Sequence, residues 1–125
     1  MKIIRQRAAL AALSMFLALG AGSSASAADV TFQLKNSHPN AVEVELYSQD
    51  RDHVWPGNNQ VYLLDDGETK QIPLSCDEGE KICYGAWISG AARTSWGVGP
   101  DNNRDCTRCC SFCTERGSME IDLGP

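Results

Sequence analysis

The sequence predicts an all-β fold: a small antiparallel β-sandwich of Ig-like architecture, with one short C-terminal cysteine-bearing helix held to it by disulfides. Two observations lead to this expectation. Seven short segments have the pattern of β-strands and are separated by turn-forming residues. The six cysteines, four of them in one C-x-x-C-C-x-x-C run, form an even set suited to disulfides. The Cys…Trp…Cys spacing of immunoglobulin domains is absent, so "Ig-like" describes the architecture alone.

Residues 1–27 have the three parts of a secretory signal peptide. Three basic residues precede an apolar stretch over residues 8–20, and Ala25-Ser26-Ala27 is an A-x-A cleavage site. The apolar stretch is shorter than the roughly 20 residues that a bilayer-spanning helix needs. We therefore expect a secreted or periplasmic protein with a single domain over residues 28–125, and no membrane insertion after cleavage.

The mature chain is expected to be strongly acidic. Residues 28–125 contain all 16 acidic residues and eight of the 11 basic ones, which gives a net charge of −8. This charge repels nucleic acid and anionic lipid head groups, so we expect neither as a partner. Solubility is the simplest role for the charge, and attraction of a basic partner or a cation is the alternative.

The first strands follow from the alternation of apolar residues. Residues 30–35 and 42–47 each place every second side chain on an apolar face. Because the turn-forming residues 36–40 lie between them, we expect these two strands to pair as an antiparallel hairpin. A short strand at 61–64 follows and ends in the turn Asp65-Asp66-Gly67.

The later strands carry features that indicate their place in a sheet. Residues 70–75 include Pro73, which cannot donate a ladder hydrogen bond, so this strand is expected at an edge or with a bulge. Residues 82–89 have no charge on either face, which indicates a central strand covered on both sides. Short strands at 95–99 and 118–123 complete the set.

The cysteine run is expected to form a helix over residues 106–116. Asp105 is suited to the N-cap, and Gly117 to the position just after the last turn. The cysteines follow the spacing i, i+3, i+4, i+7, so all four sulfurs would lie on one stripe of the helix. We expect this stripe to cover the face of the strand 82–89 that carries Cys83 and Trp87.

We expect all six cysteines to form disulfides: Cys76, Cys83, Cys106, Cys109, Cys110 and Cys113. The two upstream cysteines can take only two partners, so at least one bond must lie within the run of four. In the favoured layout that internal bond is Cys106–Cys109 or Cys110–Cys113, and the remaining two cysteines bond to Cys76 and Cys83. The alternative layout pairs Cys76 with Cys83 and places two bonds within the run.

Two other uses of the cysteine run are weighed against disulfides. Four thiolates could hold zinc or contribute to an iron–sulfur cluster. One straight helix, however, would spread the outer sulfurs over about 10 Å, too far for a single tetrahedral ion. Cys106-Thr107-Arg108-Cys109 at a helix start resembles a thiol-exchange motif, and Asp105 would oppose formation of its thiolate. We expect no metal and no cofactor.

The sequence favours a binding or interaction module without catalytic activity. The two histidines, His38 and His53, belong to no recognisable nucleophile–base set. His53 and Trp55 share a polar loop and are the candidate ligand contacts for a protein or glycan partner, whereas the alternative places Trp55 in the core. We expect a monomer. An enzyme that uses an unrecognised pair of carboxylates is a further alternative.

Overall fold

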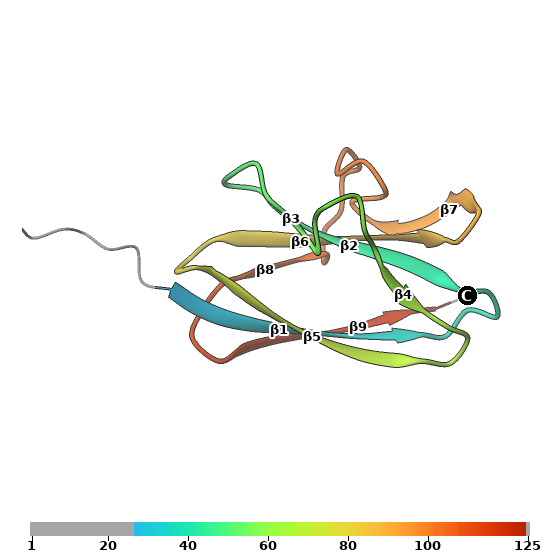
Figure 1. Ribbon diagram of the computed structural model, residues 1–125, viewed down its shortest axis with the longest axis horizontal. Helices are drawn as coiled ribbons and strands as arrows, with labels where there is room; N and C mark the ends of the chain where they lie inside the picture. Colours follow the sequence, from blue (N-terminus) through green and yellow to red (C-terminus); the bar gives the residue numbers. More distant parts are fainter. Residues whose placement is uncertain (1–26, 125) are drawn as a thin grey trace, which may run out of the picture.

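The chain folds into two β-sheets that lie face to face (Figure 1). The computed structural model describes residues 27–124, so the predicted signal peptide lies outside the described residues except for Ala27. The smaller sheet has the strand order β5-β1-β9. The larger sheet has the order β3-β2-β6-β7, with β4 also pairing with β2 and β8 with β6. The strands are β1 (Ala27–Asn36), β2 (Val42–Ser48), β3 (Val54–Trp55), β4 (Tyr62–Leu64), β5 (Thr69–Asp77), β6 (Lys81–Ile88), β7 (Ala91–Gly97), β8 (Cys110–Phe112) and β9 (Gly117–Leu123).

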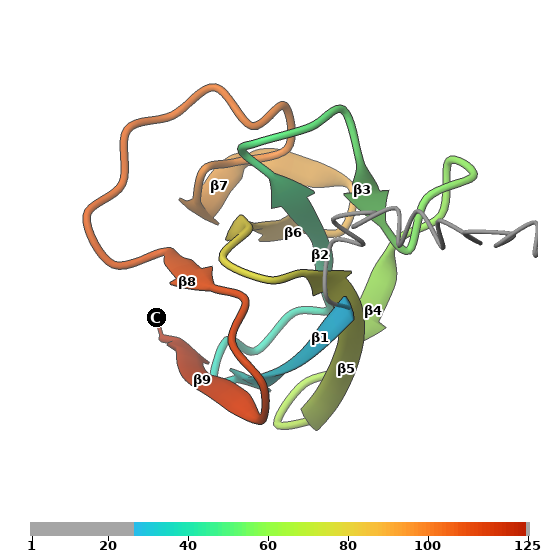
Figure 2. The ribbon, with the colours of Figure 1, turned by 90° about the vertical axis from the view of Figure 1, so that its left-hand side faces the viewer.

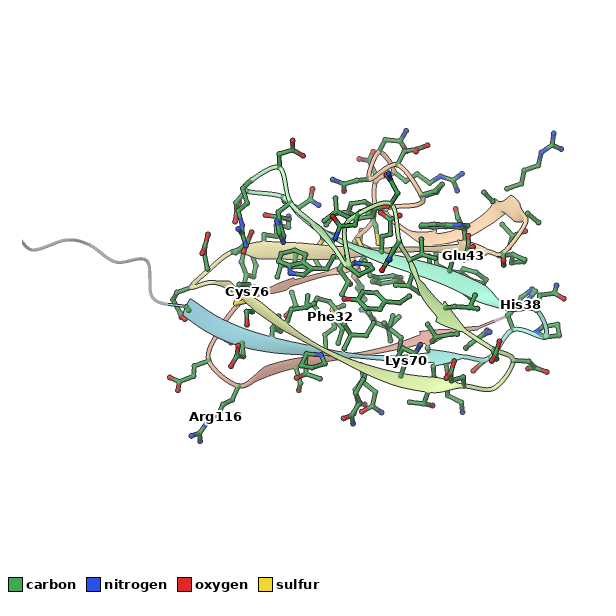
Figure 3. All side chains as sticks on the ribbon, in the orientation of Figure 1. Phe32, His38, Glu43, Lys70, Cys76 and Arg116 are labelled. Carbon is green, nitrogen blue, oxygen red and sulfur yellow. A yellow bond between two sulfur atoms is a disulfide. The ribbon has the colours of Figure 1, made fainter. Side chains whose placement is uncertain are left out.

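β1 is the central strand of the smaller sheet. Its alternating residues Val30, Phe32 and Leu34 are buried, and Phe32 points into the space between the layers (Figure 3). β1 pairs antiparallel with β5 but parallel with β9, so the expectation of a wholly antiparallel sandwich is wrong for this sheet. β5 lies at the edge of the sheet, as Pro73 predicted, and the exposed Pro73 sits opposite Thr31 of β1.

β6 lies in the middle of the larger sheet, with β2 on one side and both β7 and β8 on the other. This position confirms the prediction of a central strand. Its two faces serve different clusters: Ile82 and Ala86 belong to the main core, whereas Cys83 on the opposite face belongs to a second, smaller cluster.

The predicted hairpin between the first two strands is wrong, because β1 and β2 lie in different sheets. The buried Asn36 explains why the chain crosses between the layers here. Its Nδ2 donates to the carbonyl oxygens of Asn40, Leu64 and Asp65 at 2.9, 3.1 and 3.1 Å. Its Oδ1 accepts from the backbone N–H of His38 at 2.9 Å. A buried amide that is satisfied at both ends stabilises one geometry of the crossing.

One apolar core fills the space between the two sheets. Residues from both layers contribute to it, and burial of each such side chain stabilises the fold by about 1.5–3 kcal/mol. The tyrosines Tyr62 and Tyr84, together with Trp96 and Met119, are partly buried and pack against its margin. The largest fully buried apolar side chains of this core are Phe32, Leu34, Leu46, Leu64, Ile82 and Leu123.

The helix expected over residues 106–116 is a wrong prediction, since no helix occurs in the described part of the chain. Cys110 opens strand β8, which pairs with β6, and Gly117 opens strand β9. Cys113 is tied to the turn between β5 and β6: its N–H donates to the Glu80 carbonyl at 2.7 Å, and its carbonyl accepts from Gly79 at 2.7 Å. A helix would place the Cys110 and Cys113 side chains on one stripe, whereas here they reach partners on two different strands.

Two disulfides join these elements. Cys76 of β5 is bonded to Cys113, with their Cα atoms 6.2 Å apart, and this bond links the smaller sheet to the segment that follows β8. Cys83 of β6 is bonded to Cys110 of β8 within the larger sheet. Disulfides of this kind form and persist in oxidising compartments such as the periplasm and the extracellular space. Among residues 27–124, no helix is long and apolar enough to cross a membrane.

Candidate functional site

The outer face of the larger sheet is covered by residues 98–109, which we call the covering segment. It runs from β7 to β8 along one side of the molecule (Figure 2). Its backbone lies directly on the sheet, because a Cβ atom at Gly85 would be only 2.1 Å from the Gly99 carbonyl oxygen. The Tyr47 hydroxyl donates to the Pro100 carbonyl at 2.7 Å, and the Tyr84 N–H donates to the Cys109 carbonyl at 2.9 Å. The segment is therefore docked on the sheet at several points.

Beneath the covering segment lies a second apolar cluster, separate from the main core. Its buried members are Tyr47, Cys83, Val98 and Cys109, and Val54, Tyr84 and Cys110 pack against it. The strand 82–89 was expected to be covered on its Cys83 face, and this expectation is confirmed, with an irregular segment in place of the helix.

Four cysteines gather here, and we call Cys83, Cys106, Cys109 and Cys110 the sulfur cluster. The Sγ atoms of Cys83, Cys109 and Cys110 all lie within 4.8 Å of one another. Cys83 and Cys110 are bonded, and the Cys109 Sγ lies 3.6 Å from the Cys110 Sγ. Cys106 and Cys109 are free thiols, the first exposed and the second buried.

The thiol of Cys109 is held in its protonated form. Burial raises its pKa, and a hydrogen bond and charge repulsion from Cys106 add to this, to give a pKa of about 12. The positive charge of Lys81 acts in the opposite direction, but it is the smallest of these effects. Since the thiolate is the nucleophile and the metal ligand, the buried Cys109 thiol is a poor nucleophile in this form.

The observed disulfides agree in part with the favoured one of the two predicted layouts. The structure bonds Cys76 to Cys113 and Cys83 to Cys110, which are the long-range bonds of the favoured layout, and Cys76 is not bonded to Cys83. Cys106 and Cys109 are left over, and they are the two residues that one version of that layout joins internally. Because both are free thiols in this structure, the Cys106–Cys109 bond expected from the sequence remains a proposal.

The geometric objection to a metal site was based on a helix that does not form. Here three sulfurs lie close together, and because Cys83 belongs to β6 whereas Cys109 and Cys110 lie in and next to β8, they approach one another from two chain segments. With Cys83 and Cys110 bonded to each other, however, Cys109 is the only member of the close trio that retains a thiol. A structural zinc site needs four ligands, so the sulfur cluster does not fit zinc in this disulfide-bonded form.

The loop residues His53 and Trp55 are not arranged as a ligand site. Trp55 is 9% exposed and belongs to the main core, at the position that the alternative interpretation gave it. The exposed ring of His53 packs edge-on against it, with the ring centroids 4.5 Å apart, and the Arg51 guanidinium lies 5.7 Å from the Trp55 ring. The Trp55 ring therefore has no free face for a ligand, and we do not retain these two residues as binding contacts.

A groove that the sequence did not reveal lies beside the covering segment. The pairing of β6 with β7 is interrupted: Trp87 faces Ser95 and Ile88 faces Ala91, so residues 92–94 bulge out of the ladder. This bulge and the covering segment border a shallow, open groove of about 690 Å³, lined by residues 90–94 together with Pro100, Asp101 and Arg104. No sequence pattern marks Arg93 or Arg104, and it takes the fold to place both of them in the lining of one groove.

Comparison of the chain with protein-family models, with curated proteins and with solved structures found no match.

Proposed function

We propose that this chain is an exported, disulfide-stabilised β-sandwich of Ig-like architecture that acts as a binding module without catalytic activity, in the periplasm or outside the cell. The two face-to-face sheets, the two disulfides and the signal-like N-terminus support the proposal. The parallel pairing of β1 with β9 is compatible with an Ig-like arrangement.

The observation that carries the binding proposal is the bulge in β7. Bulges bend a strand and redirect its side chains, and they are enriched next to functional sites. Here residues 92–94 are exposed and lie outside the ladder, so Arg93 is not needed for sheet pairing. Arg104 lines the same groove from the covering segment, and its side chain donates a hydrogen bond to the Ser95 hydroxyl.

The chemistry of the groove favours a ligand that carries a carboxylate. A guanidinium presents N–H groups in a planar fork that matches a carboxylate, and two of them line this groove. Asp101 lies on the same wall and disfavours a ligand with dense negative charge. We therefore infer a ligand with isolated carboxylates, such as a uronic-acid glycan or an acidic segment of a protein.

A binding measurement tests this proposal and separates the two sources. The probes are a uronic-acid oligosaccharide, an acidic peptide, and their neutral counterparts. We expect one acidic probe to bind and the R93A/R104A variant to weaken that binding by at least about tenfold, the loss of one charge-assisted hydrogen bond. The K35A/R108A variant removes the same charge at two other exposed residues and should bind as the wild type does. If R93A/R104A binds as tightly as the wild type, or if neither acidic probe binds the wild type, the groove is not the binding site.

A further inference from the structure

The two free thiols of the sulfur cluster differ sharply in their surroundings. They belong to the sequence Cys106-Thr107-Arg108-Cys109, in which Cys106 is exposed and Cys109 is only 1% exposed. Residues 105–108 are exposed and lie between β7 and β8, outside any strand. Cys106 is thus open to another molecule, whereas Cys109 is shielded from solvent.

The buried thiol is fixed in place, which a resolving thiol requires. The Cys109 carbonyl accepts from the Tyr84 N–H at 2.9 Å, and the Cys109 side chain packs among Tyr47, Cys83 and Val98. The neighbouring disulfide anchors the next residue, Cys110, to β6. Movement is therefore left to the exposed side of the motif, where Cys106 lies.

We propose that Cys106 and Cys109 are a redox-active pair that exchanges with disulfides of other molecules, with Cys106 as the entering thiol and Cys109 as the resolving thiol. The exchange is independent of the arginine groove and goes beyond the binding function proposed above. Its substrate class is an accessible disulfide, either of a small molecule or of a protein.

The exchange takes place in two steps. The Cys106 thiolate attacks one sulfur of the incoming disulfide: a Cys106–sulfur bond forms, the incoming bond breaks, and the first thiol leaves with the proton that Cys106 gave up. The Cys109 sulfur, after losing its proton, then attacks the Cys106 sulfur. A Cys106–Cys109 bond forms, the mixed disulfide breaks, and the second thiol leaves with the proton that Cys109 gave up. Two electrons pass from the pair to the incoming disulfide, which is reduced to two thiols.

The cluster explains why the steps occur in this order. The pKa of Cys109 is raised by burial and then by Cys106, so Cys109 does not react first. Once Cys106 is in a mixed disulfide, its hydrogen bond and charge no longer raise the pKa of Cys109, and the buried thiol becomes easier to deprotonate. The first step thus prepares the second.

A redox titration of the protein as its host produces it tests the pair. Samples are equilibrated in mixtures of reduced and oxidised dithiothreitol, alkylated with iodoacetamide, and mapped by mass spectrometry of peptides. We expect Cys106 and Cys109 to change together from bonded to alkylated, under conditions in which the bonds Cys76–Cys113 and Cys83–Cys110 remain intact. If both thiols are alkylated under every condition, or if all six cysteines change together, the proposal is wrong.

Single variants test the order of the steps, with glutathione disulfide as the probe. C109A should accumulate one glutathione on Cys106, because the resolving thiol is gone, whereas C106A should acquire none on the buried Cys109. K35A, which removes an exposed charge from β1 in the other sheet, is the control and should titrate as the wild type does. Equal labelling of C106A and C109A would refute the assigned roles. If C109A fails to fold, the titration of the wild type and the absence of label on C106A decide the matter.

Discussion

Glu80 shows how a single buried charge organises one end of the molecule. Its side chain is 2% exposed, and it accepts hydrogen bonds from Arg51 Nε at 2.6 Å and Arg51 Nη2 at 3.1 Å. The Ser48 hydroxyl and the Asp77 N–H also donate to it. Burial alone would raise the pKa of Glu80, but these donors outweigh burial and lower it to about 2. The carboxylate thereby ties the end of β2 to the turn between β5 and β6.

The lowered pKa of Glu80 predicts a loss of stability in acid. Because the folded-state pKa of about 2 lies below the ordinary 4.5, the stabilisation is fully present above pH 4.5 and is lost as the pH falls toward 2. The difference corresponds to roughly 3 kcal/mol, and partial exposure of Arg51 reduces our expectation to about 2 kcal/mol. In urea unfolding at pH 6, the free energy of unfolding of E80Q should be lower than that of the wild type by this amount. Between pH 5 and pH 2.5 it should depend less steeply on pH than that of the wild type.

The matched control is E78Q, which removes a carboxylate from the exposed neighbour two residues away. E78Q should unfold at the urea concentration of the wild type at both ends of the pH range. An E80Q protein with unchanged stability at pH 6 would show that the buried ion pair contributes nothing net, as some buried pairs do.

At the scale of elements, strands with regular alternation were predictable and irregular ones were not. β1, β2, β5 and β9 lie within a few residues of their predicted ranges, because buried and more exposed side chains alternate along most of each strand. β6 was predicted from the absence of charge on either face, and it is buried on both faces. The cysteine run misled the prediction, since spacing of i, i+3, i+4, i+7 suits a helix stripe but is equally compatible with an extended segment held by two disulfides. β3 has only two residues and β8 only three, too few to show a period.

The docking of the covering segment on β6 predicts a strong effect of one added methyl group. In G85A the new Cβ would lie 2.1 Å from the Gly99 carbonyl and 2.9 Å from the Tyr47 ring, so the backbone must shift. We expect a loss of about 1–3 kcal/mol in the free energy of unfolding. Thermal or urea unfolding measures it. G124A is the control, because no atom lies within 4 Å of a Cβ there, and it should leave stability nearly unchanged. A G85A variant as stable as G124A would contradict the close contact.

At the scale of the whole molecule, the sequence identified several residues of the site but not how the fold brings them together. The cysteines were identified as disulfide-forming residues, yet their environments depend on a covering segment that no periodic pattern marks. Trp55 was a candidate ligand contact because it lies in a polar loop, with a place in the core as the alternative, and its ring supplies apolar area that this small core needs. The arginine groove arises from a bulge that only the pairing of β6 with β7 makes visible.

The two disulfides are expected to contribute comparably to global stability. They span sequence separations of 37 and 27 residues, and the loop-closure model gives about 3–4 kcal/mol for each. C76A/C113A and C83A/C110A should each lower the free energy of urea unfolding by about that amount. A loss well below 1 kcal/mol for either variant would indicate that the reduced, unfolded chain already keeps those segments together.

The parallel pairing of β1 with β9 determines when the smaller sheet can form during folding. The strand that leaves the ribosome early and the one that leaves near the end are neighbours, and the early one is the middle of its sheet. A contact between such distant parts of a sequence forms slowly, since a large loop must close first. The smaller sheet therefore cannot be completed until β9 has been synthesised, however early β1 and β5 pair.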